Sequence, residues 1–310
     1  MTAVDAAAAA VALVLVGLFG ATVEWTRRAT PSVATRVLIT MSTVVTIALA
    51  FTLAMLAAPL VGRSDIVADR AHWSDDVFAS GSRAGVTVSV LAALAIVCAT
   101  IRVTLKLRER TRHKEAANRF RDEVGAAYGE TIVAALDQPD AMALSSGVIV
   151  LTPSLIRALD PDQRRAVLAH ERAHLDRRHD RYRHLAVVVA AANPLLRRLP
   201  DAIWYLTERW ADEDAARATS RATTAAALKC VARITGPRIE HSLATMHSAV
   251  TGVPERILAL EAGPTRAGWH RLVLPAMLVA AIVVVPLTAT ERTVDLFQLA
   301  HALGHITHGH

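Results

Sequence analysis

Residues 167–175, VLAHERAHL, contain the pattern His-Glu-x-x-His, formed by His170, Glu171 and His174. On a helix, residues four positions apart lie on the same face, so both imidazoles can reach one metal ion. Glu171, next to the first histidine, is well placed to take a proton from a water at that ion. The pattern is short enough to arise by chance, so its meaning depends on the surrounding sequence.

The chain before the motif predicts that the motif lies on a helix. Asp160 and Pro161 are typical of a helix start, with the aspartate as N-cap and the proline in the first turn. We expect this helix to run to about Arg181, because neither glycine nor proline interrupts it. Further upstream, residues 141–145 and 148–152 flank a Ser-Gly pair and predict a small β-hairpin.

A zinc site needs a third protein ligand and, if it is catalytic, an open fourth position. Residues 204–219, WYLTERWADEDAARAT, place Glu208 and Asp212 four positions apart on a second predicted helix. Glu208 is our candidate ligand, and Asp212 can accept the free ring N–H of a ligating histidine. Glu213 and Asp214 lie on a different face of this helix from Glu208 and are weaker candidates. With only two cysteines in the chain, histidines and carboxylates would have to hold the ion.

The composition indicates a membrane protein. Hydrophobic residues make up 53% of the 310 residues and charged residues only 20%, and the apolar residues are clustered. Four uncharged stretches are each long enough to cross a bilayer, at residues 6–23, 37–62, 84–101 and 272–290. The first follows an acidic N-terminus, so we expect a span and not a cleaved signal peptide.

The distribution of lysine and arginine predicts the orientation in the cell membrane. The loop after the first span carries three arginines, and residues 102–114, after the third span, carry six Lys/Arg against one acid. The positive-inside rule therefore places both in the cytoplasm and the N- and C-termini outside. Binding of nucleic acid by residues 102–114 ranks last, because the adjacent bilayer accounts for the charge.

These features predict a mainly α integral membrane protein with four transmembrane helices and a cytoplasmic α+β domain between spans three and four. The predicted parts are a membrane domain over residues 1–103, a cytoplasmic domain over 104–268, and the fourth span with a short outer tail over 269–310. The apolar stretch 185–196 separates the two halves of the candidate site. As a fifth span it would hold them about 30 Å apart. We therefore expect a buried helix or one lying on the membrane surface.

HERAH at 170–174, NPLL at 193–196 and ERWAD at 208–212 together resemble the M56 metallopeptidases. These are membrane zinc proteases related to the antibiotic-sensing receptors. The wider pattern HExxH…ExxAD is shared with the M48 group of membrane proteases. The resemblance covers about residues 137–260 and the arrangement of three spans before them and one after.

The resemblance implies a gluzincin fold in which His170, His174 and Glu208 bind one Zn²⁺ ion and Glu171 is the general base. It also implies that the strands before the motif offer an edge to an extended substrate chain. Arg256, in VPERILAL, matches an arginine that assists catalysis in the M48 group. The histidine that usually precedes that arginine is missing at the expected spacing.

The leading hypothesis is a zinc-dependent integral-membrane endopeptidase that cleaves a cytoplasmic protein. The receptor proteases suggest a transcriptional repressor in a signalling relay as the substrate. Two alternatives stay open: an M48-like protease for membrane-protein quality control, and a signalling scaffold whose zinc is structural. Only a short tail follows the fourth predicted span, so we do not expect a β-lactam receptor with an outer penicillin-binding domain.

Further histidines lie outside the motif. His179 extends the predicted motif helix, and we expect it to be solvated or to lie behind a ligand without binding the metal. His301, His305, His308 and His310 are expected to belong to a polar tail, with metal or pH sensing as the alternative.

Overall fold

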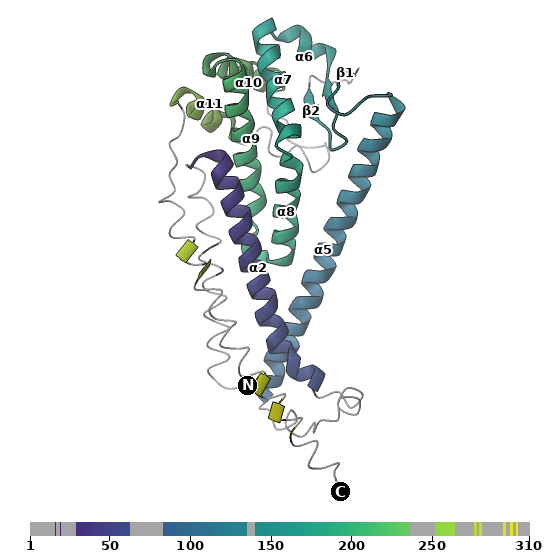
Figure 1. Cartoon of the computed structure of the whole chain (residues 1–310), viewed down its shortest axis with the longest axis vertical. Coiled ribbons are helices and arrows are strands. Elements are labelled where there is room, and N and C mark those ends of the chain that lie inside the picture. The colour runs from purple at the N-terminus through teal and green to yellow at the C-terminus, as the bar shows by residue number, and fades with distance from the viewer. Residues whose placement is uncertain are drawn as a thin grey trace.

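The computed structural model describes most of the central part of the chain: residues 29–62, 83–134, 140–235 and 252–263, with a few isolated residues nearer the termini. Within this part, helices predominate and one small sheet is present. Two long helices, α2 (Pro31–Gly62) and α5 (Arg83–Glu123), cross near one end of the molecule and diverge toward the other, where the remaining elements gather (Figure 1).

Helices α2 and α5 are long and apolar enough to cross a membrane, judged by length and composition. In the most apolar 18-residue stretch of each helix, only 22% of α2 and 11% of α5 is buried within the protein. Their exposed side chains include Ile47, Leu94 and Val97. Exposed apolar side chains at this density suit a helix that faces lipid.

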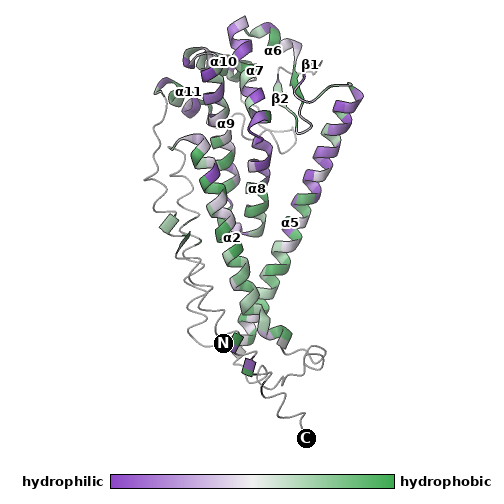
Figure 2. Ribbon diagram, in the orientation of Figure 1, coloured by the Kyte–Doolittle hydropathy of each residue, from purple (hydrophilic) through white to green (hydrophobic). Residues whose placement is uncertain are grey.

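Hydropathy divides α5 into two halves. Figure 2 shows apolar residues along α2 and the first half of α5, whereas the second half of α5 is hydrophilic. The two helices contain the predicted spans 37–62 and 84–101, and α5 continues as a polar helix beyond its span. The other two predicted spans, 6–23 and 272–290, lie outside the described residues.

The sheet has three short strands in the order β1 (Thr131–Val133), β3 (Ile149–Leu151), β2 (Ala141–Ala143). Strands β2 and β3 are antiparallel, as predicted for a hairpin, whereas β1, which was not predicted, pairs parallel with β3. The turn between β2 and β3 requires Gly147, which has φ +90°, and a Cβ there would lie 2.0 Å from the Tyr128 ring. Because β3 lies in the middle of the strand order, β2 is an edge of the described sheet.

Two short sequence signals start the next two helices. Thr152 caps α6 (Pro153–Ala158) by accepting a hydrogen bond from a backbone amide in its first turn. Asp160 caps α7 (Pro161–Asp176), and its side chain and that of Gln163 each accept a hydrogen bond from the other's backbone amide. This reciprocal pair satisfies two amides that a helix start leaves unbonded. Helix α7 carries the HExxH motif.

The prediction that this helix continues to about Arg181 is wrong. Helix α7 ends at Asp176, and α8 (His179–Ala192) begins three residues later. Between them Arg178 has φ 54°, the left-handed conformation. That conformation costs a non-glycine residue roughly 1–2 kcal/mol, so an arginine here is no local signal for a helix break.

Helix α8, the short 3-10 helix η2 (Pro194–Leu196) and α9 (Leu199–Ala218) form a hairpin that packs against α2. The core between them contains buried Leu38 from α2 and Ile203 from α9, among other residues. The apolar stretch 185–196 is thus the end of α8 together with η2. It does not run on as a separate long helix, which agrees with the interpretation of a buried helix.

Two more helices complete the described part of the domain. Helix α10 (Arg221–Thr235) packs against α7 and α9, and α11 (Val253–Glu261) packs against α10 and α9. A second core, formed around Leu151, Leu155 and Leu159, joins the sheet and α6 to α7 and α10. Helix α7, with the HExxH motif, therefore packs against α9, α10 and strand β2.

Candidate metal centre

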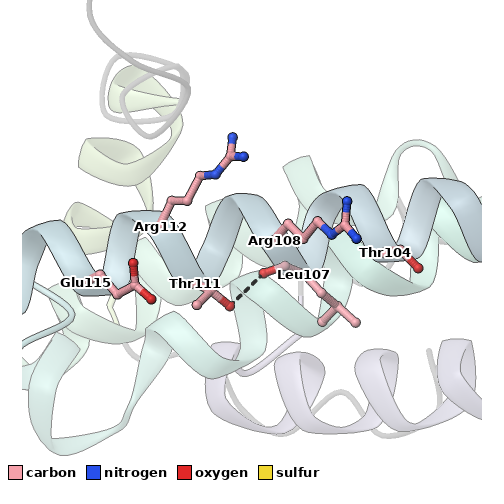
Figure 3. A pocket seen from close by; sticks show the side chains of 6 residues that line it. All are labelled: Thr104, Leu107, Arg108, Thr111, Arg112 and Glu115. Carbon is pink, nitrogen blue, oxygen red and sulfur yellow. Dashed lines mark hydrogen bonds between the residues drawn. The ribbon is translucent and has the colours of Figure 1, made fainter.

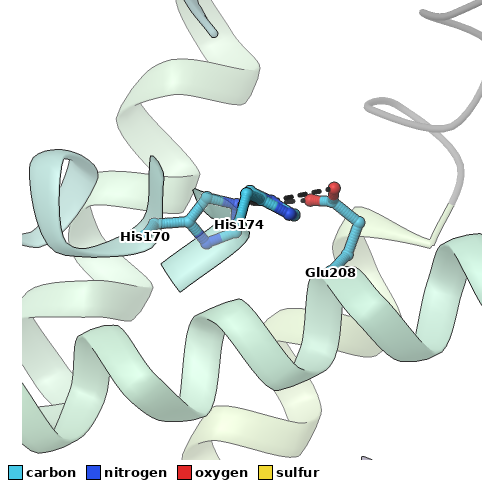
Figure 4. Close-up of side chains that lie close together, drawn as sticks. All are labelled: His170, His174 and Glu208. Atoms are coloured by element: carbon cyan, nitrogen blue, oxygen red, sulfur yellow. Dashed lines mark hydrogen bonds and ion pairs between the residues drawn. The ribbon is translucent and has the colours of Figure 1, made fainter. Parts of the chain in front are cut away.

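Helices α7 and α9 lie side by side and bring His170, His174 and Glu208 together (Figure 4). The Nε2 atoms of the two histidines are 3.1 Å apart. Glu208 Oε2 lies 3.4 Å from His170 Nε2, and Glu208 Oε1 lies 3.4 Å from His174 Nε2.

These separations suit a zinc ion. With metal–ligand bonds of about 2.0–2.1 Å, two ligand atoms of a tetrahedral zinc site are about 3.3 Å apart. Two imidazole nitrogens and one carboxylate form a donor set typical of catalytic zinc. The three side chains are also largely buried, at 10–15% exposed, so they are poorly hydrated and face one another. The residues present therefore fit the metal that the sequence predicted.

Glu171, the predicted general base, lies buried next to the ligands. Burial raises the pKa of its carboxyl to about 7, although the charge of His170 and a hydrogen bond from the backbone amide of Ala143 act against the rise. Ala143 belongs to the edge strand β2. A carboxyl group with a pKa near neutrality can both accept and release a proton under physiological conditions.

Asp212 lies behind His170, where the sequence placed an acceptor for a ligand's ring. Its Oδ1 is 3.0 Å from His170 Nδ1, the nitrogen that does not face Glu208. Burial disfavours the charged form of His170, but its hydrogen bonds with Asp212 and Glu208 outweigh this and raise its pKa to about 10. Asp212 therefore fixes the orientation of the ring.

Arg256 contacts two carboxylates of α9, those of Asp212 and Glu208. Its Nε and Nη2 each donate a 2.7 Å hydrogen bond to Asp212, and its Nη1 lies 2.9 Å from Glu208 Oε2. All three residues are buried. Burial would raise the pKa of Asp212, but the charge of Arg256 outweighs it and lowers the pKa. Arg256 thus holds Asp212 ionised and in place behind His170.

Arg183, on α8, is a further site residue that the sequence did not single out. Its Nη2 lies 2.6 Å from Glu208 Oε1, its Nε donates to Thr207 Oγ1, and its guanidinium lies 4.7 Å above the Trp204 ring. Burial would raise the pKa of Glu208, but Arg256, His174, His170 and Arg183 together hold it well below its ordinary range. Arg183 stands in an arginine-rich stretch, so no local pattern distinguishes it from its neighbours.

His179 lies behind the second ligand, one of the two placements that the sequence left open. It is fully buried, and its Nδ1 is 2.8 Å from Nδ1 of His174. Its ring centroid is 5.0 Å from that of Trp210. Burial lowers the pKa of His179 to about 3, so the imidazole is neutral.

The weaker carboxylate candidates pair elsewhere. Glu213 forms an ion pair with Arg221, and Asp214 forms ion pairs with Arg177 and Arg217. Neither belongs to the ligand cluster found among the described residues.

The polar half of α5 carries a separate feature, an open hollow of about 320 Å³ (Figure 3). It contains no residue of the metal centre. Its lining residues are Thr104, Leu107, Arg108, Thr111, Arg112 and Glu115.

Residues 106–232 match the family model described as Peptidase family M48. The matched region runs from the polar half of α5 into α10 and includes the whole ligand set, whereas Arg256 lies beyond it. M48 is a gluzincin-type family of zinc-dependent metallopeptidases. No curated protein and no solved structure matches the chain. The match thus supports a metallopeptidase domain of the M48 type, and the narrower M56 assignment stays a prediction.

Proposed function

We propose that this protein is a membrane-anchored zinc endopeptidase. One observation carries the proposal: His170, His174 and Glu208 present their ligand atoms 3.1–3.4 Å apart, with Glu171 buried beside them, inside an M48-type region. Zinc held there would polarise a carbonyl group and make water nucleophilic at neutral pH.

Glu171 is the residue that moves protons in this proposal. Its carboxylate accepts a proton from the attacking water and later donates it to the nitrogen of the leaving amine. Burial disfavours the charged form of this carboxyl, which favours its uptake of the proton. Asp212 orients His170, so this ligand needs little rearrangement when the metal enters.

The edge strand β2 is the proposed docking site for substrate. On either side of β2, Asp140 O accepts a hydrogen bond from the amide of Thr152 and the amide of Leu144 donates to Val148 O, at the two ends of β3. Because such bonds alternate along an antiparallel strand, the backbone groups of Ala141 and Ala143 point away from β3. The amide of Ala141 bonds to Asp140 Oδ1 and that of Ala143 to Glu171, so an extended substrate could pair along this edge, next to Glu171, by taking the place of these side chains. Recognition through backbone groups favours unfolded polypeptide segments.

A structural zinc site is the alternative without catalysis. Such sites saturate the metal with four protein ligands. Among the described residues the cluster has three ligands, with a carboxyl of raised pKa beside them. This arrangement favours the catalytic proposal over a scaffold.

The membrane placement that we propose is the one predicted from charge: four spans in the cell membrane, termini outside and the metal centre in the cytoplasm. The packing of α2 against α8 and α9 supports a metal centre close to the membrane surface. Substrates would then be cytoplasmic segments near the bilayer.

Two substrate classes follow from the two resemblances. The M48 match favours unfolded segments of membrane proteins, as in quality control. The resemblance of HERAH, NPLL and ERWAD to the receptor proteases favours a single transcriptional repressor. New protein N-termini in cells with the wild-type protein, compared with cells with Glu171→Gln, distinguish them. Many sites in membrane proteins support the first class, and one soluble target supports the second.

Cleavage of a labelled unfolded polypeptide by the purified full chain tests the function itself. Glu171→Gln keeps the size of the side chain and should retain zinc but lose cleavage. Asp162→Asn is the matched control. Asp162 is an exposed acid on the same helix, and among the described residues its side chain forms an ion pair with Arg165. Full activity of Glu171→Gln would refute the mechanism.

A further inference from the structure

The two histidine ligands have different supports. His170 Nδ1 faces the Asp212 carboxylate, whereas His174 Nδ1 faces the imidazole of His179 at 2.8 Å. A ligating histidine commonly donates its other ring N–H to a carboxylate, a backbone carbonyl or a water. A neutral imidazole accepts the same hydrogen bond but adds no negative charge to the site.

The contact fixes where the protons lie. His174 presents Nε2 to the metal site, so its Nδ1 carries the proton and donates it. Nδ1 of His179 must then be the acceptor, and His179 carries its own proton on Nε2. Within the described residues His179 Nε2 has no hydrogen-bond partner. The bond to His174 is therefore the one that the structure gives this ring.

The ring of His179 is held from behind by Trp210, whose centroid is 5.0 Å away. Trp210 is itself buried and is contacted by Tyr182, with centroids 6.1 Å apart. The guanidinium carbon of Arg36 lies 5.0 Å from the centroid of the Trp210 ring, a cation–π contact. Arg36 belongs to the first turns of α2, a candidate membrane span. A continuous series of contacts therefore joins α2 to a metal ligand.

We propose that His179 is a positioning residue for the zinc ligand His174, and that Arg36 supports it through Trp210. The start of the membrane helix α2 is then part of the structure that holds the metal. This inference rests on the metal site of the proposed function. It adds His179 and helix α2 to the residues that hold that site, although neither belongs to the ligand set.

The test is zinc affinity, measured on the purified full chain by competition with a chromophoric chelator. His179→Phe keeps a ring against Trp210 but removes the acceptor, and we expect zinc to bind about 10- to 100-fold more weakly. His179→Asn should restore most of the affinity, because its Oδ1 can take the place of Nδ1. His179→Gln places its oxygen near the position of Nε2 and should behave like His179→Phe.

The absorption spectrum of the Co²⁺-substituted protein is the second measurement, since it reports ligand geometry directly. The spectrum should change in His179→Phe and match the wild type in His179→Asn. Equal affinities and spectra for all three variants and the wild type would overturn the positioning role. So would an equal loss in His179→Asn and His179→Gln, which would indicate packing alone. If His179→Phe does not fold, the Asn and Gln variants decide the question.

The contribution of α2 is tested separately by Arg36→Gln. Loss of an exposed cation–π contact predicts zinc binding weaker by about two- to fivefold. Arg102→Gln is the matched control, an exposed arginine at the corresponding end of the span in α5. Equal zinc affinities of Arg36→Gln and Arg102→Gln would overturn the link to α2.

Different results would refute the metal site of the proposed function and the positioning role of His179. If the wild-type chain binds neither Zn²⁺ nor Co²⁺, or if His170→Ala binds as tightly as the wild type, the metal site itself is refuted. If the wild type binds both ions and His179→Phe binds them equally well, only the positioning role is refuted.

Discussion

Arg256 donates two hydrogen bonds of 2.7 Å to Asp212, although the residues are 44 positions apart in the chain and come from α11 and α9. The same aspartate lies 3.0 Å from His170 Nδ1. A helix outside the family-matched region therefore contributes to the orientation of the candidate ligand His170. The salt bridge is buried, so its loss leaves uncompensated charge inside the protein.

Arg256→Met should lower the free energy of unfolding by about 3–5 kcal/mol, because it leaves Asp212 and Glu208 buried with one cation fewer. Thermal unfolding of the metal-free chain measures the loss. Arg165→Met is the control, since Arg165 is exposed and pairs at the surface with the equally exposed Asp162. Such a surface pair contributes about 0–1 kcal/mol. Equal effects of the two substitutions would contradict the role given to Arg256.

Asp212→Ala should weaken zinc binding by about 10- to 100-fold, because His170 loses the acceptor that orients its ring. Chelator competition measures the affinity. Glu213→Ala, at the next position on α9, removes a carboxylate that pairs with Arg221 and lies outside the ligand cluster. It should leave the affinity unchanged. Unaltered zinc affinity in folded Asp212→Ala would show that the ring is held by other means.

Arg183→Met should destabilise the metal-free protein more than the zinc-loaded protein. Without zinc, Glu208 is stabilised by Arg183 and Arg256, whereas bound zinc supplies a further positive charge. The rise in thermal midpoint on adding zinc should therefore be larger in Arg183→Met than in the wild type. A smaller rise would mean that Arg183 acts mainly with the metal present.

Ala143→Pro should sharply reduce cleavage of an unfolded polypeptide while zinc is retained. Proline removes the amide that bonds to Glu171 and places a ring on the outer side of the edge strand β2. Val133→Pro is the matched control, at an exposed position of β1 on the opposite edge of the described sheet. Equal activity of the two variants would indicate that substrate does not use the β2 edge.

Much of the fold could be predicted because its signals are local. The caps at Thr152 and Asp160, the turn at Gly147 and the long uncharged runs each specify structure within a few residues. The break at Arg178 could not be predicted, because a left-handed arginine is unfavourable by itself and no side-chain cap marks the start of α8. Strand β1 is only three residues long and depends on pairing with β3.

In the candidate site, too, some residues could be predicted from local sequence patterns and others could not. The residues at i and i+4 spacing on one helix, His170 with His174 and Glu208 with Asp212, could be proposed from the sequence. Arg183 and Trp210 could not, because their roles depend on how helices α8, α9 and α2 pack together. Their residue types occur throughout helical surfaces and cores, so spacing alone does not single them out.

Metal dependence of cleavage tests the central claim most directly. The purified full chain is assayed on an unfolded polypeptide as prepared, after removal of metal by a chelator, and after return of one equivalent of zinc. We predict that cleavage is lost with the metal and restored with the zinc, and that Glu171→Gln is inactive in all three states. Cleavage by the wild type that persists without metal, or by Glu171→Gln with zinc bound, would contradict the assignment of this site as a zinc endopeptidase.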